Sequence, residues 1–232
     1  MGRRTLTGEL AQYLSDRQTH RSWSLAAQDG IISTAGILLG FTGAGVSERM
    51  LVIGGTAGIV AGMLTAGGAK WSETAAEREA QLSAIREERL ELRQHPEEEQ
   101  EELARYYEEK GLSPDLAAEV ARHLMIRSPL KSALESEHGV LRTIAAMDVA
   151  IAGVGTSLAF GLGAAIPFAI AYYLPLDIEV WLIIFSVFVA LSLISIVGAR
   201  AGHMDVYRTI RRTLTIGSVT IVVSYLVGQI AF

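Results

Sequence analysis

The sequence predicts an all-α membrane protein with five transmembrane helices and a charged helical domain inserted between the second and the third. Half of the 232 residues are apolar and the mean hydropathy is +0.32, which is high for a soluble domain. Charges are unevenly distributed, because residues 140–200 contain only five. No stretch alternates polar and apolar residues as a half-buried strand does.

Five apolar stretches are long enough to cross a bilayer, which takes about 20 residues in a helix. They are residues 24–46, 50–70, 144–172, 179–199 and 213–232. The third contains Pro167, which predicts a tilted, broken or kinked helix. The chain therefore divides into a polar tail (1–22), two membrane helices (23–72), an insert (73–140) and three further membrane helices (141–232).

The distribution of arginines predicts the orientation in the membrane. The polar tail lacks the apolar core of a signal peptide, so the first membrane helix is expected to act as its own insertion signal. Arginines gather in the tail and in the connection before the fifth helix. Because basic segments stay in the cytoplasm, the N-terminus and the insert are expected there. The expected location is a bacterial plasma membrane.

The insert is expected to be helical throughout. The second membrane helix continues to residue 94, since residues 71–94 contain no glycine or proline. Pro96 and the glutamates after it suit a helix start, and Gly111 ends that helix. Ser113-Pro114 and Ser128-Pro129 each begin a further helix, with serine as N-cap. The middle helix carries a stripe that needs an apolar partner: Leu112, Leu116, Val120 and Leu124.

Carboxylates are concentrated in the first half of the insert, where residues 86–110 hold 10 of the 25 acidic residues of the chain. Glu88 and Glu91 share one helix face, and Glu99 and Glu102 share a face of the next helix. A turn at Pro96 would bring the four together, where their repulsion favours a divalent cation. Oxygen ligands suit Mn²⁺, Fe²⁺, Mg²⁺ or Ca²⁺.

A solvated helix surface is the alternative interpretation of this segment. The neighbouring arginines could pair with the glutamates along each helix: Arg86, Arg89, Arg93 and Arg105. The histidines of the insert are likewise expected to be surface or capping residues: His95, His123 and His138.

Composition and motifs exclude several classes of function. The net charge of −5 makes nucleic acid an unexpected partner. There is no cysteine, hence no disulfide and no thiolate metal site. The sequence has no nucleophile–base set, no phosphate loop and no redox-cofactor motif, so neither an enzyme nor an organic cofactor is expected.

Two features stand out in the first pair of membrane helices. Asp29 is an ionisable residue among apolar neighbours, which makes it a functional candidate unless it lies in water at the membrane edge. The second helix carries a row of small residues, which predicts close approach of two helix backbones: Gly54, Gly58, Gly62 and Ala66.

The first membrane helix contains the segment QDGIISTAGILLGFTGAG, and the insert contains the segment HPEEEQEELARYYEEKGLSPDLAAEVARHLM. Together with the order of the five membrane helices, these segments resemble the vacuolar iron transporter family, which includes plant vacuolar iron transporters and yeast calcium-cross-complementing transporters. The resemblance covers residues 22–232. It implies a homodimer with five membrane helices per protomer. It also implies export of Fe²⁺, and often Mn²⁺, from the cytoplasm in exchange for protons, along a path between the first and second helices at the dimer interface.

The resemblance assigns roles by position. The glutamates that collect metal in the cytoplasmic domain correspond to Glu88, Glu91, Glu99, Glu102 and Glu137. Some members of the family carry two methionines in the insert, and this chain has Ala133 and Leu134 at those positions. In the second membrane helix the family has a glutamate and a methionine as metal ligands. This chain has Gly58 and Ala66 at those positions, and neither carries a side chain that can bind a metal. The path is then expected to depend on Asp29, Ser33 and Thr34, with Met63 as a substitute thioether.

Three functional hypotheses follow from these residues. The first is a proton-coupled Fe²⁺/Mn²⁺ exporter with the glutamates as metal collector and Asp29 at the pore mouth. Asp148 could carry protons, or could simply lie at the membrane interface. The second is a non-transporting, membrane-anchored metal buffer, sensor or scaffold. The third is a charged insert that serves only for docking or dimerisation.

Overall fold

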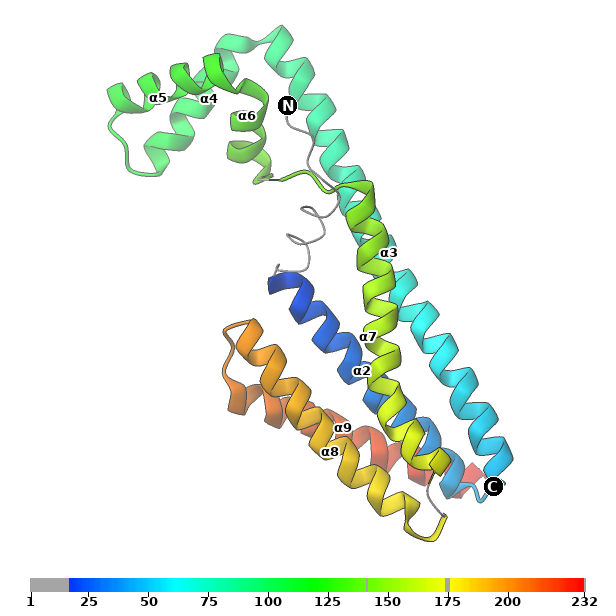
Figure 1. The fold of residues 1–232 in the computed structure, drawn as a ribbon. Helices are drawn as coiled ribbons and strands as arrows, with labels where there is room; N and C mark the ends of the chain where they lie inside the picture. The colour runs from blue at the N-terminus through cyan, green and yellow to red at the C-terminus, as the bar shows by residue number, and fades with distance from the viewer. Residues whose placement is uncertain (1–16, 141, 174–175, 232) are drawn as a thin grey trace. The chain divides into compact units, whose positions relative to one another are not determined.

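The computed structural model describes residues 17–140, 142–173 and 176–231, which form helices and no strand (Figure 1). The all-α prediction is therefore confirmed for this part of the chain. The helices are α2 (Arg17–Gly43), α3 (Glu48–Gln94), α4 (Pro96–Glu109), α5 (Pro114–Arg127), α6 (Pro129–His138), α7 (Ala146–Tyr173), α8 (Leu176–Ala201) and α9 (Val206–Ala231).

Five of these helices, α2, α3, α7, α8 and α9, are long and apolar enough to cross a membrane. The protein is accordingly an integral membrane protein, as its sequence predicts. α9 begins at Val206 instead of the predicted residue 213, because its polar first turns are helical too. α7 is one helix with a buried Pro167 inside it, so the proline does not end the helix.

The chain divides into two compact units. One is formed by the residues up to Ser72 together with those from Ala150 onward, and the other is Glu73–Val149. α3 belongs to both, since it is 47 residues long and continues beyond its apolar half, as the absence of glycine and proline predicts. The second unit also contains the first turn of α7.

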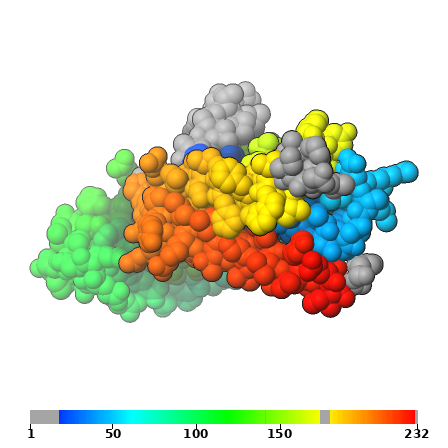
Figure 2. Space-filling model, turned by 90° about the horizontal axis from the view of Figure 1, so that it is seen from below, coloured from blue at the N-terminus to red at the C-terminus, as the bar shows by residue number. Residues whose placement is uncertain are grey.

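In the first unit, α2 is the central helix. Its most apolar window is 56% buried, whereas those of the other four spanning helices are 17–39% buried. Ile31, Leu38 and Leu39 of α2 are almost completely buried and form the core with residues of α8 and α9. Figure 2 shows α8 and α9 side by side on one face of this unit.

Glycines mark the places where helix backbones meet, but these are not the predicted ones. Gly163 of α7 lies against the carbonyl of Ala27 in α2, and Gly228 of α9 lies against the carbonyl of Gly40. In the predicted row on α3, by contrast, Gly54 and Gly58 face side chains of α2 and Gly62 faces a side chain of α7. These three glycines make room for large apolar side chains instead of for another backbone.

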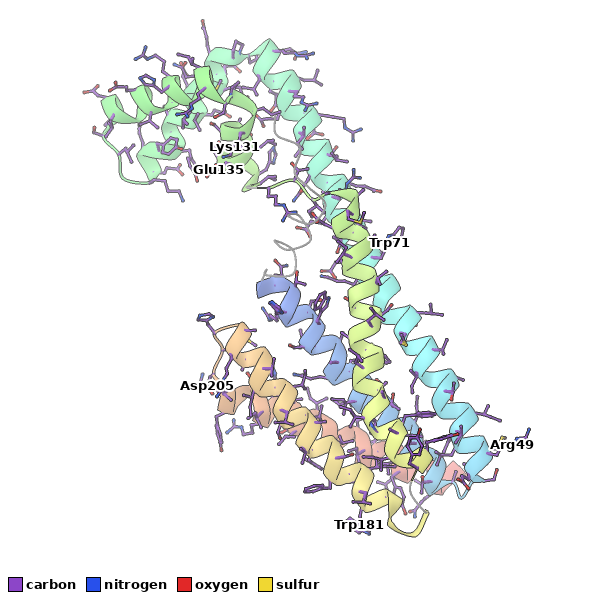
Figure 3. All side chains as sticks on the ribbon, viewed as in Figure 1. Arg49, Trp71, Lys131, Glu135, Trp181 and Asp205 are labelled. Carbon is purple, nitrogen blue, oxygen red and sulfur yellow. The ribbon has the colours of Figure 1, made fainter. Side chains whose placement is uncertain are left out.

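Aromatic and charged residues lie near the ends of the apolar segments (Figure 3). Trp71 of α3 is 55% exposed and Trp181 near the start of α8 is 75% exposed. Arg49 lies in the first turn of α3, and Asp205 directly precedes α9. Tryptophan is favoured at the boundary between lipid and water, so this placement fits helices that span a bilayer.

The second unit is built from the polar end of α3 and the helices α4, α5 and α6. Its buried residues include Leu103 of α4 and Ala117 and Ala121 of α5. The predicted leucine stripe is therefore only partly right, because Leu116 is 49% exposed and the alanines face the neighbouring helices. Ser113 is the N-cap of α5 as predicted, although its side chain makes no capping hydrogen bond.

Candidate metal-binding site

The carboxylate cluster forms where a single residue separates two helices. α3 ends at Gln94 and α4 begins at Pro96. The N–H of His95 donates to the carbonyl of Glu91 at 2.7 Å, and the N–H of Glu99 donates to the carbonyl of His95 at 3.1 Å. His95 thus ends one helix and caps the next, which puts the last turns of α3 beside the first turns of α4.

The five glutamates that the sequence singles out are brought together there, with His138 as an additional member. The cluster contains three groups in which one ligand atom of each residue lies within 4.8 Å of the others. The groups are Glu88 with Glu91 and Glu99, Glu99 with Glu102 and Glu137, and Glu88 with Glu137 and His138.

The centre of the cluster is buried, and its outer members are exposed. Glu88 is 0% exposed and Glu99 is 7% exposed, whereas Glu91, Glu102 and Glu137 face solvent. Within the described residues, and with the acids ionised, both carboxylate oxygens of Glu88 and Oε2 of Glu99 are buried without a hydrogen-bond partner. A buried polar atom without a partner costs about 1–3 kcal/mol, and more when it is charged. In the part of the chain that the structure describes, no arginine, lysine or backbone N–H therefore compensates the carboxylate of Glu88, and a nitrogen near it is Nε2 of His138, at 3.6 Å from Oε2.

Burial and crowding raise the pKa values of these acids. The pKa of Glu88 rises from 4.5 to about 8, chiefly through burial, with the carboxyl groups of Glu99 and Glu137 adding to the effect. The pKa of Glu137 rises to about 7, again chiefly through burial and then through its acidic neighbours. Burial also raises the pKa of Glu99. Without a cation, part of the cluster therefore holds protons near neutral pH.

The solvated-surface interpretation accounts for the edge of the cluster only. Arg105 pairs with Glu102 at 3.1 Å, and His95 pairs with Glu98 at 3.7 Å. Over the described ranges, no ion pair joins Arg86, Arg89 or Arg93 to a carboxylate, and no arginine or lysine reaches Glu88. Pairing with arginines thus leaves the negative charge of the buried Glu88 and Glu99 uncompensated.

His138 is the member of the cluster that the sequence did not predict. Its Nε2 lies 3.6 Å from Oε2 of Glu88, and its side chain is 36% exposed. Neighbouring residues on a helix point about 100° apart, so the adjacency of His138 to Glu137 in sequence did not place both in one site. At the positions of the family's methionine pair, Ala133 and Leu134 are buried in the apolar core.

The expected path residues lie in different environments. Asp29 is exposed and accepts a hydrogen bond from Oγ of Ser33 at 3.2 Å. Thr34 is buried at 1% exposure. Met63 is half-buried, with its sulfur against Gly161 of α7. The structure thus joins Asp29 to Ser33, while the sulfur of Met63 lies against another helix.

Asp148 has a structural role at the start of α7. Its Oδ2 accepts hydrogen bonds from the guanidinium of Arg142 and from the backbone N–H of Ala145, both at 3.0 Å. An acid in the first turn that reaches back to the preceding N–H is half of a capping box. This geometry favours the interfacial interpretation of Asp148 over that of a proton carrier.

An all-helical chain with five apolar spanning helices and a polar unit of clustered carboxylates defines an integral membrane protein with an acidic helical domain. The sequence profile of the VIT family matches residues 20–229, and the protein belongs to that family. The vacuolar iron transporter of Acanthamoeba castellanii is 32% identical to this chain over 120 residues. The alignment covers 52% of this chain and 43% of that protein, so the chain matches less than half of the relative's length.

Proposed function

We propose that the protein exports Fe²⁺ or Mn²⁺ from the cytoplasm in exchange for protons, and that the carboxylate cluster collects the metal on the cytoplasmic side. Membership of the VIT family and the relative named as a vacuolar iron transporter support this function. The observation that carries it is Glu88, which is completely buried among four other carboxylates with neither oxygen hydrogen-bonded. A divalent cation would supply the missing charge and the missing ligand contacts at once.

The raised pKa values support coupling to protons. Glu88 and Glu137, with pKa values of about 8 and about 7, hold protons in part of the population near neutral pH. Because a metal ion binds the ionised carboxylates, its arrival releases those protons. Exchange of metal for protons at the collector is thus a property of the cluster itself.

We propose that Asp29 and Ser33 receive the ion at the mouth of a path that is completed by a second protomer. Asp29 is exposed on the central helix of the membrane unit, next to Ser33. The apolar window of α3 is only 17% buried, which leaves a large apolar face for a second copy or for lipid. Since Gly58 and Ala66 offer no ligand side chain, the ion keeps part of its water shell in this path.

Reconstituted proteoliposomes test the proposal. Mn²⁺ uptake is measured at a fixed pH gradient for wild type, for Glu88→Gln/Glu99→Gln and for Glu101→Gln/Glu135→Gln, which alters two exposed acids of α4 and α6 (Glu135 is labelled in Figure 3). Proton-dependent Mn²⁺ flux is expected in the wild type and in the control. In Glu88→Gln/Glu99→Gln the flux is expected to be lower by about tenfold or more. The exporter hypothesis fails if wild type shows no metal-dependent flux under conditions in which another member of the family is active.

A membrane-anchored metal buffer or sensor is the second candidate, and one observation favours it. Gly58, at the position of the family's membrane glutamate, faces the side chain of Ile37, and Gly62 faces Phe160. Apolar side chains thus occupy the space beside these two positions. Saturable Mn²⁺ binding that is lost in Glu88→Gln/Glu99→Gln, together with no flux in wild type, would establish this second function instead.

A further inference from the structure

His138 is the last residue of α6, and the chain leaves the helix directly after it. Gly139 has the left-handed conformation (φ 63°, ψ 18°), which glycine adopts without strain. The N–H of Val140 donates to the carbonyl of Leu134 at 3.0 Å and closes the end of the helix. This capped last turn carries both Glu137 and His138.

The imidazole of His138 lies beside the most buried carboxylate of the cluster. The distance of 3.6 Å from Nε2 to Oε2 of Glu88 is longer than a hydrogen bond. Two ligand atoms about 2.1 Å from one ion, at an angle of about 90–110°, are about 3.0–3.4 Å apart. The observed separation exceeds that span only slightly, so a small side-chain adjustment would let both atoms contact one ion.

We propose that His138 is a metal ligand, which with Glu88 and Glu137 forms a mixed nitrogen–oxygen site that selects transition-metal ions over Ca²⁺ and Mg²⁺. Ligand atoms of the three residues lie within 4.8 Å of one another, and the carboxylate of Glu88 is fully buried without a hydrogen-bond partner. This inference rests on the proposed metal-binding function.

The nitrogen donor adds a property that the five glutamates cannot supply. Ca²⁺ and Mg²⁺ take oxygen ligands, whereas imidazole suits the later transition metals such as Fe²⁺, Co²⁺ and Zn²⁺. The two carboxylates of the group also balance the charge of a divalent ion. Selection against Ca²⁺ and Mg²⁺ therefore comes from His138, and the attraction for divalent ions in general comes from the acids.

An ion pair between protonated His138 and Glu88 is the competing explanation of the same contact. In that case His138 acts on Glu88 alone, and its removal changes the affinity for every divalent ion by a similar factor. A ligand, in contrast, changes the affinity for ions that accept nitrogen and leaves that for Ca²⁺ close to the wild-type value. The ratio of the two affinities distinguishes the explanations.

Calorimetric titration of the full-length protein in detergent with Co²⁺ and with Ca²⁺ measures this ratio. The variants are His138→Ala and, as matched control, His123→Ala, which removes an exposed histidine of α5 in the same unit. His138→Ala is expected to lower the affinity for Co²⁺ about tenfold or more, with Ca²⁺ binding and the control unchanged. An unchanged affinity for Co²⁺, or equal losses for Co²⁺ and Ca²⁺, overturns the inference.

A spectroscopic measurement keeps the inference falsifiable if the variant folds poorly. X-ray absorption spectroscopy of Co²⁺ bound to the wild type is expected to show an imidazole nitrogen among its ligands, and the absence of that nitrogen overturns the proposal. Absence of any saturable divalent-ion binding in wild type overturns the proposed function as well. If Co²⁺ binding is lost in Glu88→Gln but unchanged in His138→Ala, only the role of His138 is overturned, and the proposed function stands.

Discussion

Gly30 of α2 lies so close to Ala164 of α7 that a β-carbon on Gly30 would be 3.0 Å from the amide nitrogen of Ala164 and would meet the carbonyl of Phe160. The two helices therefore touch at the level of their backbones. Asp29, one residue earlier, points about 100° away around the helix and is exposed. The Asp-Gly pair thus gives α2 a packing position and an exposed acid in consecutive residues.

Gly30→Ala is expected to destabilise the membrane unit by about 1–3 kcal/mol, because the added methyl group has to push two backbones apart. Thermal unfolding in detergent measures the effect. Gly68→Ala is the matched control, since a β-carbon at Gly68 meets nothing within 4 Å. Alanine also favours helix by up to about 1 kcal/mol, so the control is expected to be neutral or stabilising. Equal effects of the two substitutions would contradict the contact.

Asp29→Asn is expected to lower metal flux about tenfold or more while calorimetric binding to the carboxylate cluster stays unchanged, because the proposed path and the cluster use different side chains. Met63→Leu provides the comparison. The sulfur of Met63 lies against Gly161, and leucine has a similar volume, so packing is retained and only the thioether is lost. A loss of flux in Met63→Leu would assign the thioether a place in the path.

The stability of the metal-free protein is expected to fall as the pH rises from about 5 to about 8. The pKa of Glu88 is about 8 and that of Glu137 is about 7 in the folded protein, against 4.5 as the ordinary value. The folded state therefore binds protons more tightly than the unfolded chain does, and the resulting stability is lost as these groups ionise. Thermal unfolding in the presence of a chelator measures this dependence.

Added Mn²⁺ is expected to raise the midpoint of unfolding more at about pH 8 than at about pH 5, because it binds ionised carboxylates and stabilises the folded state by mass action. Glu88→Gln is expected to flatten the pH dependence without metal, and Glu101→Gln, an exposed acid of α4, is expected to leave it unchanged. If the midpoint of unfolding of the metal-free protein rose from about pH 5 to about pH 8, ionisation of the clustered carboxylates would not destabilise the folded state, and the prediction would be wrong.

Asp148→Ala is expected to cost about 1–2 kcal/mol, since it removes the carboxylate that accepts from Ala145 at the start of α7 and pairs with Arg142. Asp148→Asn retains an oxygen acceptor and is expected to cost less. The proton dependence of flux is expected to stay unchanged in Asp148→Asn. A lost proton dependence in a stably folded Asp148→Asn would reassign this residue to proton transfer.

Local patterns were sufficient for the helices themselves. The five membrane spans follow from apolar length, and the unbroken α3 follows from the absence of glycine and proline in residues 71–94. Pro96, Pro114 and Pro129 each begin a helix as predicted, because proline suits the first helical turn. These signals act within a few residues, so they can be read without knowing which helices meet.

The contacts between helices could not be obtained in this way. The leucine stripe predicted the covered face of α5, yet Ala117 and Ala121 are its buried residues. The glycine row of α3 predicted contact between backbones, yet Gly54 faces the side chain of Phe41. Small residues permit several partners, and the sequence does not specify which of them is adjacent.

By itself, the sequence determined the class of this protein: apolar segments of spanning length, a polar helical unit and four carboxylates paired by helical spacing. The tertiary structure alone decided that Glu88 is buried, that its oxygens lack donors and that His138 from α6 lies beside it. The reason is physical. Helical periodicity is a property of neighbouring residues, whereas burial and electrostatic coupling depend on which surfaces meet when helices distant in the chain pack together.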